Sequence, residues 1–246
     1  MLLRADGVSK SFDAVAAVRD VTFGIQPGEL VALIGPNGAG KTTLFNLISG
    51  MLSPDAGRIL FDGEEISWLR PHRIAHKGIG LAFQITNVFA RLTVFQNVQV
   101  ALFSARGMSG SLWTFGPRGL REETEEILTA IGLRPMAGLA AEALSQADKK
   151  RLELGIALAV RPRLLLLDEP TSGQSGEETS LTTELIRRIN QEQGLTVLFI
   201  EHKMDVVFGI ARRVLVMHNG HLLADGDPRS VRRDEQVRKA YLGETA

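Results

Sequence analysis

The sequence predicts an α/β domain in which a mainly parallel sheet is joined by an antiparallel layer and a helical lobe. Three short runs are apolar at nearly every position, as strands buried on both faces of a parallel sheet are: Leu30–Ile34, Leu164–Leu167 and Val197–Ile200. Between about residues 89 and 143 the strand pattern stops and helical patterns take over. We therefore expect a single domain over residues 1–246, with both sheets in about 1–88 and 144–246 and the helical subdomain in about 89–143.

Weaker apolar runs next to turn signals predict the more exposed strands, the first of which belong to the antiparallel layer. These runs are Val21–Ile25, Arg58–Phe61, Val214–Met217 and His221–Ala224. Helical patterns cover Lys41–Ser49, Thr93–Phe103, Leu120–Ile131 and Asp234–Leu242. The segment Ser104–Gly119 is rich in glycine and serine and is expected to form a loop.

Composition excludes several classes of protein. The chain has no cysteine, so disulfides and thiolate metal sites are impossible, and an intracellular setting is expected. Its 28 Lys and Arg balance its 28 Asp and Glu, whereas a dedicated nucleic-acid binder carries a basic excess, so we expect no nucleic-acid partner. The apolar runs are far shorter than the roughly 20 residues that cross a bilayer. We also expect no secretory signal, because no long apolar segment follows Met1.

A glycine-rich segment follows the predicted strand Leu30–Ile34 and opens the predicted helix. It reads Gly35-Pro36-Asn37-Gly38-Ala39-Gly40-Lys41-Thr42 and fits the pattern G-x-x-x-x-G-K-[ST]. Glycines let the backbone turn its N–H groups toward phosphate oxygens, and the helix N-terminus adds its positive end. The pattern predicts a phosphate-binding loop in which Lys41 reaches the β- and γ-phosphates, Thr42 ligates Mg²⁺ and Thr43 lines the same site. An ordinary glycine-rich turn is the alternative, but chance matches to the whole pattern are rare.

Two adjacent carboxylates end the buried strand Leu164–Leu167. Ligands of parallel sheets bind at the carboxyl ends of the strands, where Asp168 and Glu169 follow. Asp168 suits a water-mediated hold on Mg²⁺, and Glu169, one residue further out, suits the activation of an attacking water. An isolated acidic pair at a strand end is commonly only solvated, but its combination with the loop favours a nucleotide site.

The remaining motifs make the chain resemble the ABC ATPases over essentially its whole length. Leu144-Ser145-Gln146-Ala147-Asp148 occupies the position of their LSGGQ signature, Gln84 matches their Q-loop and His202 their switch histidine. Phe12 and the segment from Ser172 to Ser175 lie where the family has its adenine-stacking aromatic and its D-loop. The run Arg151–Leu154 and the ending Val237–Gly243 look like the ATPases of branched-chain amino acid importers and of their urea and amide relatives.

The resemblance implies a fold and a set of roles. The fold is a P-loop core sheet of the RecA type, an antiparallel β layer and a helical subdomain. Gln84 is implied to ligate Mg²⁺ and, with His202, to sense the γ-phosphate; Phe12 stacks on adenine, and Ser145 closes over ATP held by an opposite subunit. Lys41, Gln84, Glu169 and His202 are the implied catalytic residues. Outside such a family, a lone glutamine or histidine is more often structural, and an aromatic near a strand end is more often core.

Two departures from the family pattern stand out. Gln146 and Ala147 replace the two signature glycines and Asp148 the following glutamine, while Ser175 replaces the aspartate of the D-loop. We expect the helix after the signature to begin at about Lys149, and an Asp148 side chain that faced phosphate would repel it. This altered closing surface favours a heterodimer with a second, related ATPase over a homodimer.

The sequence thus predicts an ATP-binding and ATP-hydrolysing ABC transporter subunit that powers import of a small polar solute, such as branched-chain amino acids. ATP and Mg²⁺ are the expected cofactors, and membrane subunits and a second ATPase subunit the expected partners, at the cytoplasmic face of the inner membrane. Two alternatives stay open. One is a soluble ABC-type ATPase of DNA repair or translation, which usually carries paired domains or coiled coils. The other is a nucleotide-binding regulatory subunit with a degenerate signature.

Overall fold

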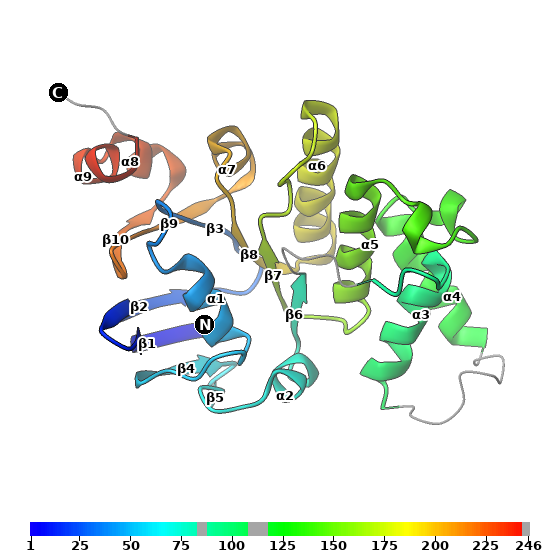
Figure 1. Cartoon of the computed structure of the whole chain (residues 1–246), viewed down its shortest axis with the longest axis horizontal. Helices are drawn as coiled ribbons and strands as arrows, with labels where there is room; N and C mark the ends of the chain where they lie inside the picture. Colours follow the sequence, from blue (N-terminus) through cyan, green and yellow to red (C-terminus); the bar gives the residue numbers. More distant parts are fainter. Residues whose placement is uncertain (83–87, 108–117, 243–246) are drawn as a thin grey trace.

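The computed structural model describes residues 1–82, 88–107 and 118–242, and these form two sheets with helices around them (Figure 1). An antiparallel sheet has the order β2-β1-β4-β5. Its strands are β1 (Leu3–Phe12), β2 (Val15–Ile25), β4 (Ala56–Phe61) and β5 (Glu64–Glu65). The second sheet has the order β10-β9-β3-β8-β7-β6 and is parallel except for β10, which pairs antiparallel with β9. The predicted α/β class with a separate antiparallel layer is therefore confirmed.

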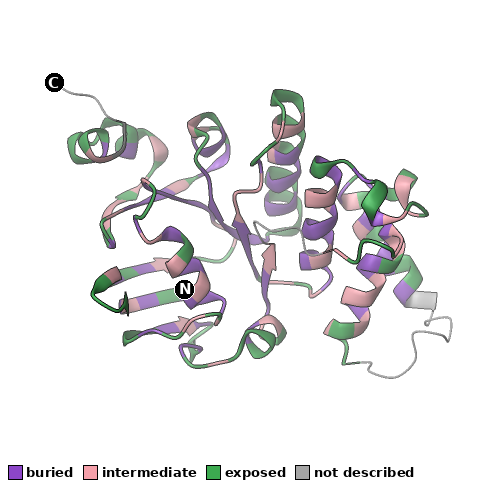
Figure 2. Cartoon of the chain, viewed as in Figure 1, coloured by how far each residue is buried: buried purple, intermediate pink, exposed green. Residues whose placement is uncertain are grey.

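The strands of the second sheet include all three predicted buried runs. They are β3 (Leu30–Ile34), β6 (Ile79–Ala82), β7 (Leu164–Asp168), β8 (Thr196–Ile200), β9 (Arg213–His218) and β10 (His221–Gly226). Figure 2 shows the centre of this sheet buried throughout. The expectation that Val214–Met217 would be a more exposed strand is wrong. This segment lies within β9, between β10 and β3, and its four residues are fully buried because both faces of the sheet are covered.

Alternate residues of each central strand pack into two different cores. On β3, Val31 and Leu33 face the core shared with the antiparallel sheet and α1 (Lys41–Ile48), whereas Leu30, Ala32 and Ile34 face the core under the larger helices. This alternation follows from the two-residue period of a strand. It explains why the central strands are apolar at every position.

The helices divide between the sheet and a lobe at one side of the molecule. Along the sheet and toward the C-terminus lie α2 (Pro71–His76), α6 (Gly176–Gln193), α7 (Met204–Ile210), α8 (Pro228–Arg233) and α9 (Glu235–Val237), followed by a π-helical turn, η3 (Arg238–Leu242). The lobe holds α3 (Val94–Ala105), α4 (Arg118–Ala130) and the 3₁₀ turns η1 (Arg134–Met136) and η2 (Ala141–Ala143). The predicted helices Thr93–Phe103 and Leu120–Ile131 correspond to α3 and α4.

The helix α5 (Gln146–Leu158) lies between the lobe and the sheet, in contact with α3, α4 and β6 (Figure 1). Most of the predicted loop Ser104–Gly119 lies outside the described residues. Within the described ranges, no helix is long and apolar enough to span a membrane.

Candidate functional site

Three glycines of the loop between β3 and α1 have a positive φ, and at two of them a side chain would also collide with a neighbouring strand. Gly35 has φ +153°, and a Cβ atom there would lie 2.2 Å from the carbonyl oxygen of Met217. Gly40 has φ +99°, and its Cβ would lie 2.2 Å from the carbonyl oxygen of Ala17. Both distances are far below van der Waals contact, so β9 and β2 press directly on the loop backbone. By contrast, a Cβ at Gly38 would meet nothing within 4 Å.

The same loop presents a cation and the open end of a helix. Lys41 is 6% exposed, and its Nζ donates to the carbonyl oxygens of Gly35 (2.8 Å) and Pro36 (3.0 Å). The N-cap of α1 is Gly40, which offers no side-chain acceptor, so the N–H groups of the first turn face outward. Thr42, in that first turn, is exposed. An anion such as a phosphate therefore fits this loop.

The carboxylates at the end of β7 lie next to the histidine that follows β8. Glu169 has a left-handed backbone with φ +50°, which costs a residue other than glycine about 1 to 2 kcal/mol. Its N–H donates to the carbonyl oxygen of Ile200 (3.0 Å), so the neighbouring strand holds it in place. In this conformation Glu169 Oε1 lies 3.0 Å from His202 Nε2. The structure thus brings together two predicted catalytic residues that are 33 positions apart.

The charges of the loop and of β7 act on one another. Burial lowers the pKa of Lys41, while the carboxylates of Glu169 and Asp168 act in the opposite direction. Burial and, next, the charge of Glu169 raise the pKa of Asp168, and Lys41 and His202 offset part of this rise. A divalent cation would relieve the repulsion between these two carboxylates, so the donor set of Thr42 and Asp168 fits Mg²⁺. Hard oxygen ligands of this kind are the ones that Mg²⁺ prefers.

Two residues that the sequence analysis did not single out build the support of the site. Glu201 is 3% exposed, and its carboxylate accepts from the N–H groups of Thr171 (3.1 Å), His202 (2.8 Å) and Lys203 (3.2 Å). The Nζ of Lys203 donates to the carbonyl oxygens of Thr171 (3.1 Å) and Gln174 (3.3 Å). Both residues tie the segment after β8 to the segment after β7. The only signal for them in the sequence is that they flank His202.

The turn before α5 keeps its polar groups paired with one another. The helix begins at Gln146, not at Lys149 as predicted, and Ser145 is its N-cap. Ser145 Oγ accepts from the N–H of Asp148 (3.1 Å) and donates to its Oδ2 (2.7 Å). The buried Asp148 carboxylate also forms an ion pair with Arg151. Its charge is therefore compensated within this turn.

Comparison with known proteins gives this arrangement a family. Residues 18–172 match the family model described as ABC transporter, which is more than half of the chain. The chain belongs to the ABC transporter family. Residues 221–246 match a second model, described as branched-chain amino acid ATP-binding cassette transporter. The predicted ABC ATPase class is thereby confirmed.

Curated relatives match over almost their entire length. The chain is 37% identical to the high-affinity branched-chain amino acid transport ATP-binding protein BraF of Pseudomonas aeruginosa, covering 99% of this chain and 98% of the relative. It is 34% identical, with the same coverage, to the lipopolysaccharide export system ATP-binding protein LptB of Haemophilus influenzae. A crystal structure of a nucleotide-free ATP-binding cassette from an ABC transporter superposes with a TM-score of 0.87 at 29% identity and covers 99% of both chains.

The structure describes two of the three remaining predicted ABC motifs. Gln84 lies outside the described residues, so its predicted roles stay predictions. Phe12 is 44% exposed at the end of β1, with the Lys10 ammonium 5.8 Å from its ring centroid. The paired strand β2 carries Ala17, whose carbonyl borders Gly40, so this hairpin lies beside the loop. In the D-loop position, Ser175 is the N-cap of α6 and forms a capping box with Glu178.

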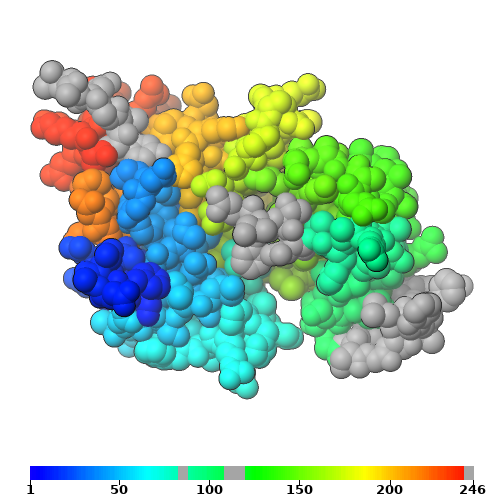
Figure 3. Space-filling view, viewed as in Figure 1, coloured from blue at the N-terminus to red at the C-terminus, as the bar shows by residue number. Residues whose placement is uncertain are grey.

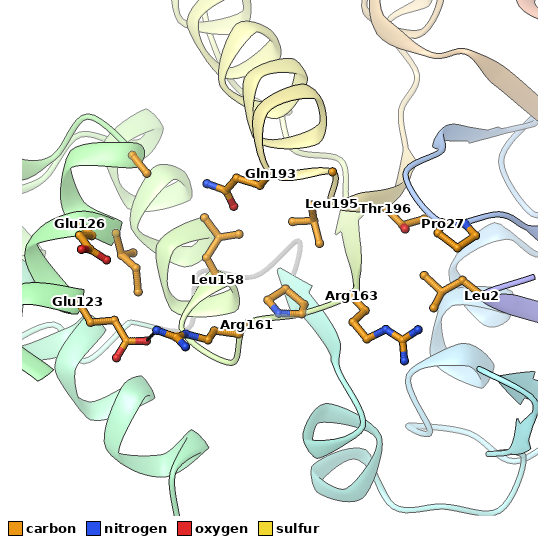
Figure 4. A pocket seen from close by; sticks show the side chains of 14 residues that line it. Leu2, Pro27, Glu123, Glu126, Leu158, Arg161, Arg163, Gln193, Leu195 and Thr196 are labelled. Carbon is orange, nitrogen blue, oxygen red and sulfur yellow. Dashed lines mark ion pairs between the residues drawn. The ribbon is translucent and has the colours of Figure 1, made fainter. Parts of the chain in front are cut away.

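A separate groove lies at the opposite ends of β7 and β8. It has a volume of about 450 Å³ and is lined by residues of α4, of the segment before β7 and of the segment before β8 (Figure 4). Arg161 crosses from the core to pair with the buried Glu123 of α4 (2.8 Å), and Glu123 also pairs with Arg106. Because the loop between β3 and α1 and Asp168 lie at the carboxyl edge of the sheet, this groove is separate from the candidate nucleotide site. It marks where the lobe is fastened to the core.

Proposed function

We propose that this chain binds Mg²⁺·ATP at the loop between β3 and α1 and hydrolyses it to drive an ABC transporter. The observation that carries the proposal is the convergence of Lys41, Asp168 and the Glu169–His202 contact at one edge of the sheet. Lys41 in the loop and Asp168 at the end of β7 are more than a hundred residues apart in the sequence. Their meeting beside an open helix N-terminus supports a shared ligand.

Each residue then has a step in hydrolysis. The loop N–H groups and the start of α1 hold the phosphates, and Lys41 exchanges its two loop carbonyls for β- and γ-phosphate oxygens. Thr42, Asp168 and the predicted ligand Gln84 would hold Mg²⁺, which would neutralise charge on the phosphates. Glu169 orients the attacking water and takes its proton, while His202, held 3.0 Å away, contacts the γ-phosphate. Phe12 and Thr43 complete the cradle at the adenine and phosphate ends.

We infer that the functional unit is a dimer in which Ser145 closes over the nucleotide of the opposite subunit. The hydroxyl proton of Ser145 is directed at Asp148 in the free subunit, so Ser145 must break that bond to donate to a phosphate. Breaking this bond costs energy each time the dimer closes. A second, related ATPase with an intact signature would bear this cost at only one of the two sites. A heterodimer is therefore our proposal, with a homodimer as the alternative.

We propose that membrane subunits dock between the core and the helical lobe, at the cytoplasmic face of the inner membrane. Figure 3 shows a notch at the rim between the segment around α2 and the lobe. In the described segment that begins at Val88, Phe89 is 58% exposed, which suits a contact with another chain, whereas Val88 packs against the core. Aromatic side chains are common at such interfaces.

The transported solute is proposed to be a branched-chain amino acid or a related small polar compound. This rests on the match of residues 221–246 to the branched-chain model and on the likeness to BraF. The likeness to LptB makes lipopolysaccharide export the second candidate. Uptake of labelled leucine by cells with and without the gene separates the two, because an exporter would leave uptake unchanged.

The proposed site is tested by removing the proton acceptor and the phosphate-binding lysine in turn. Glu169→Gln is expected to bind ATP normally but to cut turnover at least about 100-fold, since a general base contributes that much. Lys41→Ala is expected to weaken ATP binding itself. Isothermal titration and phosphate release measure the two effects, with the exposed Glu177→Gln on α6 as the matched control. Normal turnover by Glu169→Gln would refute the assignment of the site.

A further inference from the structure

The helix α5 carries the basic run Lys149-Lys150-Arg151, in which Lys150 has no role in the site described so far. Arg151 pairs with Asp148 in its own turn. The Lys150 Nζ instead donates to the main-chain carbonyl oxygen of Glu169 at 2.8 Å. The bond is partly buried and joins residues 19 positions apart. Lys149 is the matched neighbour, and within the described residues its side chain makes no hydrogen bond or ion pair.

The carbonyl oxygen that accepts from Lys150 belongs to Glu169, whose backbone is strained. Glu169 has φ +50°, a conformation disfavoured for any side-chain-bearing residue, and such residues persist only where the surroundings over-determine them. On one side, the Glu169 N–H is fixed by the carbonyl of Ile200. On the other side, the Glu169 carbonyl accepts from Lys150 and from the N–H of Ser172 (3.1 Å). Of the three contacts, only the one from Lys150 is made by a side chain.

We propose that Lys150 is a positioning residue for ATP hydrolysis, which fastens α5 to the backbone of Glu169 and so aims the Glu169 carboxylate at His202 and the attacking water. The inference rests on the proposed role of Glu169 as proton acceptor. Loss of the Lys150 bond frees the peptide after Glu169 to relax toward ordinary backbone angles, which swings the carboxylate away from His202. Misplacement of a catalytic group by about 1 Å costs on the order of 100-fold in rate.

The arrangement also connects two parts of the same subunit. Lys150 lies five residues after Ser145, which is about 7.5 Å along the helix axis. A shift of α5 along or away from the sheet therefore reaches the Glu169 carbonyl through one hydrogen bond. The turn that is proposed to close over the partner's nucleotide and the proton acceptor of its own site are thereby mechanically joined.

The test compares Lys150→Met, Lys150→Arg and the matched Lys149→Met, using the full-length protein with Mg²⁺·ATP. For Lys150→Met we expect kcat to fall at least about 10-fold while KM and the Kd for ATP change less than about 3-fold. Lys150→Arg keeps a cationic donor and is expected to restore kcat to within about 3-fold of the wild type, and Lys149→Met to leave it unchanged. Hydrogen exchange at the amide of Ser172 should accelerate in Lys150→Met alone.

Several outcomes would overturn the inference. Wild-type kcat in Lys150→Met, an equal loss in Lys149→Met, or no recovery with Lys150→Arg each contradicts a positioning role. If Lys150→Met loses its cooperative thermal transition, Lys150→Gln takes its place, because a shorter polar side chain cannot reach the carbonyl. A wild-type kcat in Lys150→Gln would then contradict the inference. Failure of the proposed function looks different, since Glu169→Gln and the wild type would then have equal turnover.

Discussion

The predicted phosphate-binding loop and the signature turn, residues 144–151, differ in how strongly their backbones restrict the residues that they can carry. At Gly35 and Gly40 the loop backbone has a positive φ and lies against main-chain atoms, so a side chain has neither an allowed conformation nor space. Residues 144–151 of the signature turn are all described, and none has a positive φ. Gln146 and Ala147 are simply the first residues of α5.

This difference explains where the family pattern is kept and where it is lost. Glycine in the loop is required by the fold of this subunit itself, because the neighbouring strands touch the backbone there. Glycine in the signature turn is not required by this subunit, so its only use would be to let another surface approach. A subunit can therefore lose the signature glycines and still fold, and we expect the cost to arise when a partner closes over this turn.

The largest effect is expected for a change at Gly35. Gly35→Ala places a Cβ 2.2 Å from the Met217 carbonyl oxygen and is expected to destabilise the protein by about 3 kcal/mol or more and to abolish ATP binding. Gly38→Ala, in the same loop, meets nothing within 4 Å and has only the left-handed strain of about 1 kcal/mol. Urea unfolding and titration with ATP measure both. Equal losses in the two variants would contradict the claim that strand contacts dictate the loop glycines.

The loop was predictable from the sequence because its chemistry is local. Eight consecutive residues between a strand and a helix define it, and the buried strands were visible as uninterrupted apolar runs. The predicted start of α5 at about Lys149 is wrong, although a local signal for the true start is present. Ser145 with Asp148 three residues later is a helix N-terminal pattern that places the first helical residue at Gln146.

The support of the site was not predictable in the same way. The contacts of Lys150 with Glu169 and of Glu201 with Thr171 join residues 19 and 30 positions apart. No spacing rule connects such pairs, because their meeting depends on the order β8-β7-β6 and on the place of α5 over those strands. The burial of β9 has the same origin, since a neighbouring strand and the covering helices decide it. Sequence patterns therefore indicate candidate ligand-binding residues more readily than the residues that hold those candidates in place.

An intermediate effect is expected when the signature is restored. The variant Gln146→Gly/Ala147→Gly/Asp148→Gln removes the Ser145–Asp148 bond and the pairing with Arg151, so α5 should lose about 1 to 2 kcal/mol of stability. It also frees the Ser145 hydroxyl and uncovers the backbone, which should raise ATP turnover of the protein alone roughly 10-fold.

The control for this variant is Asp148→Asn, which removes the charge and keeps both side chains at 146 and 147. Turnover is measured for each protein alone and mixed with the second ATPase of the same transporter. If the wild type alone already hydrolyses ATP as fast as the mixture, the altered signature does not slow hydrolysis. It then gives no reason to propose a heterodimer.

The smallest effect is expected at the D-loop position, where Ser175 replaces the family aspartate and caps α6. Ser175 accepts from the N–H of Glu178 (3.3 Å), and the Glu178 carboxylate accepts from the N–H of Ser175 (2.9 Å). Ser175→Ala should therefore destabilise the protein by about 1 kcal/mol, while Ser175→Asp, which restores the family residue, should be neutral because aspartate caps equally well. Ser180→Ala, a mid-helix change on α6, is the control and should have almost no effect. A loss of stability in Ser175→Asp as large as in Ser175→Ala would mean that the serine is required by the fold, as the loop glycines are.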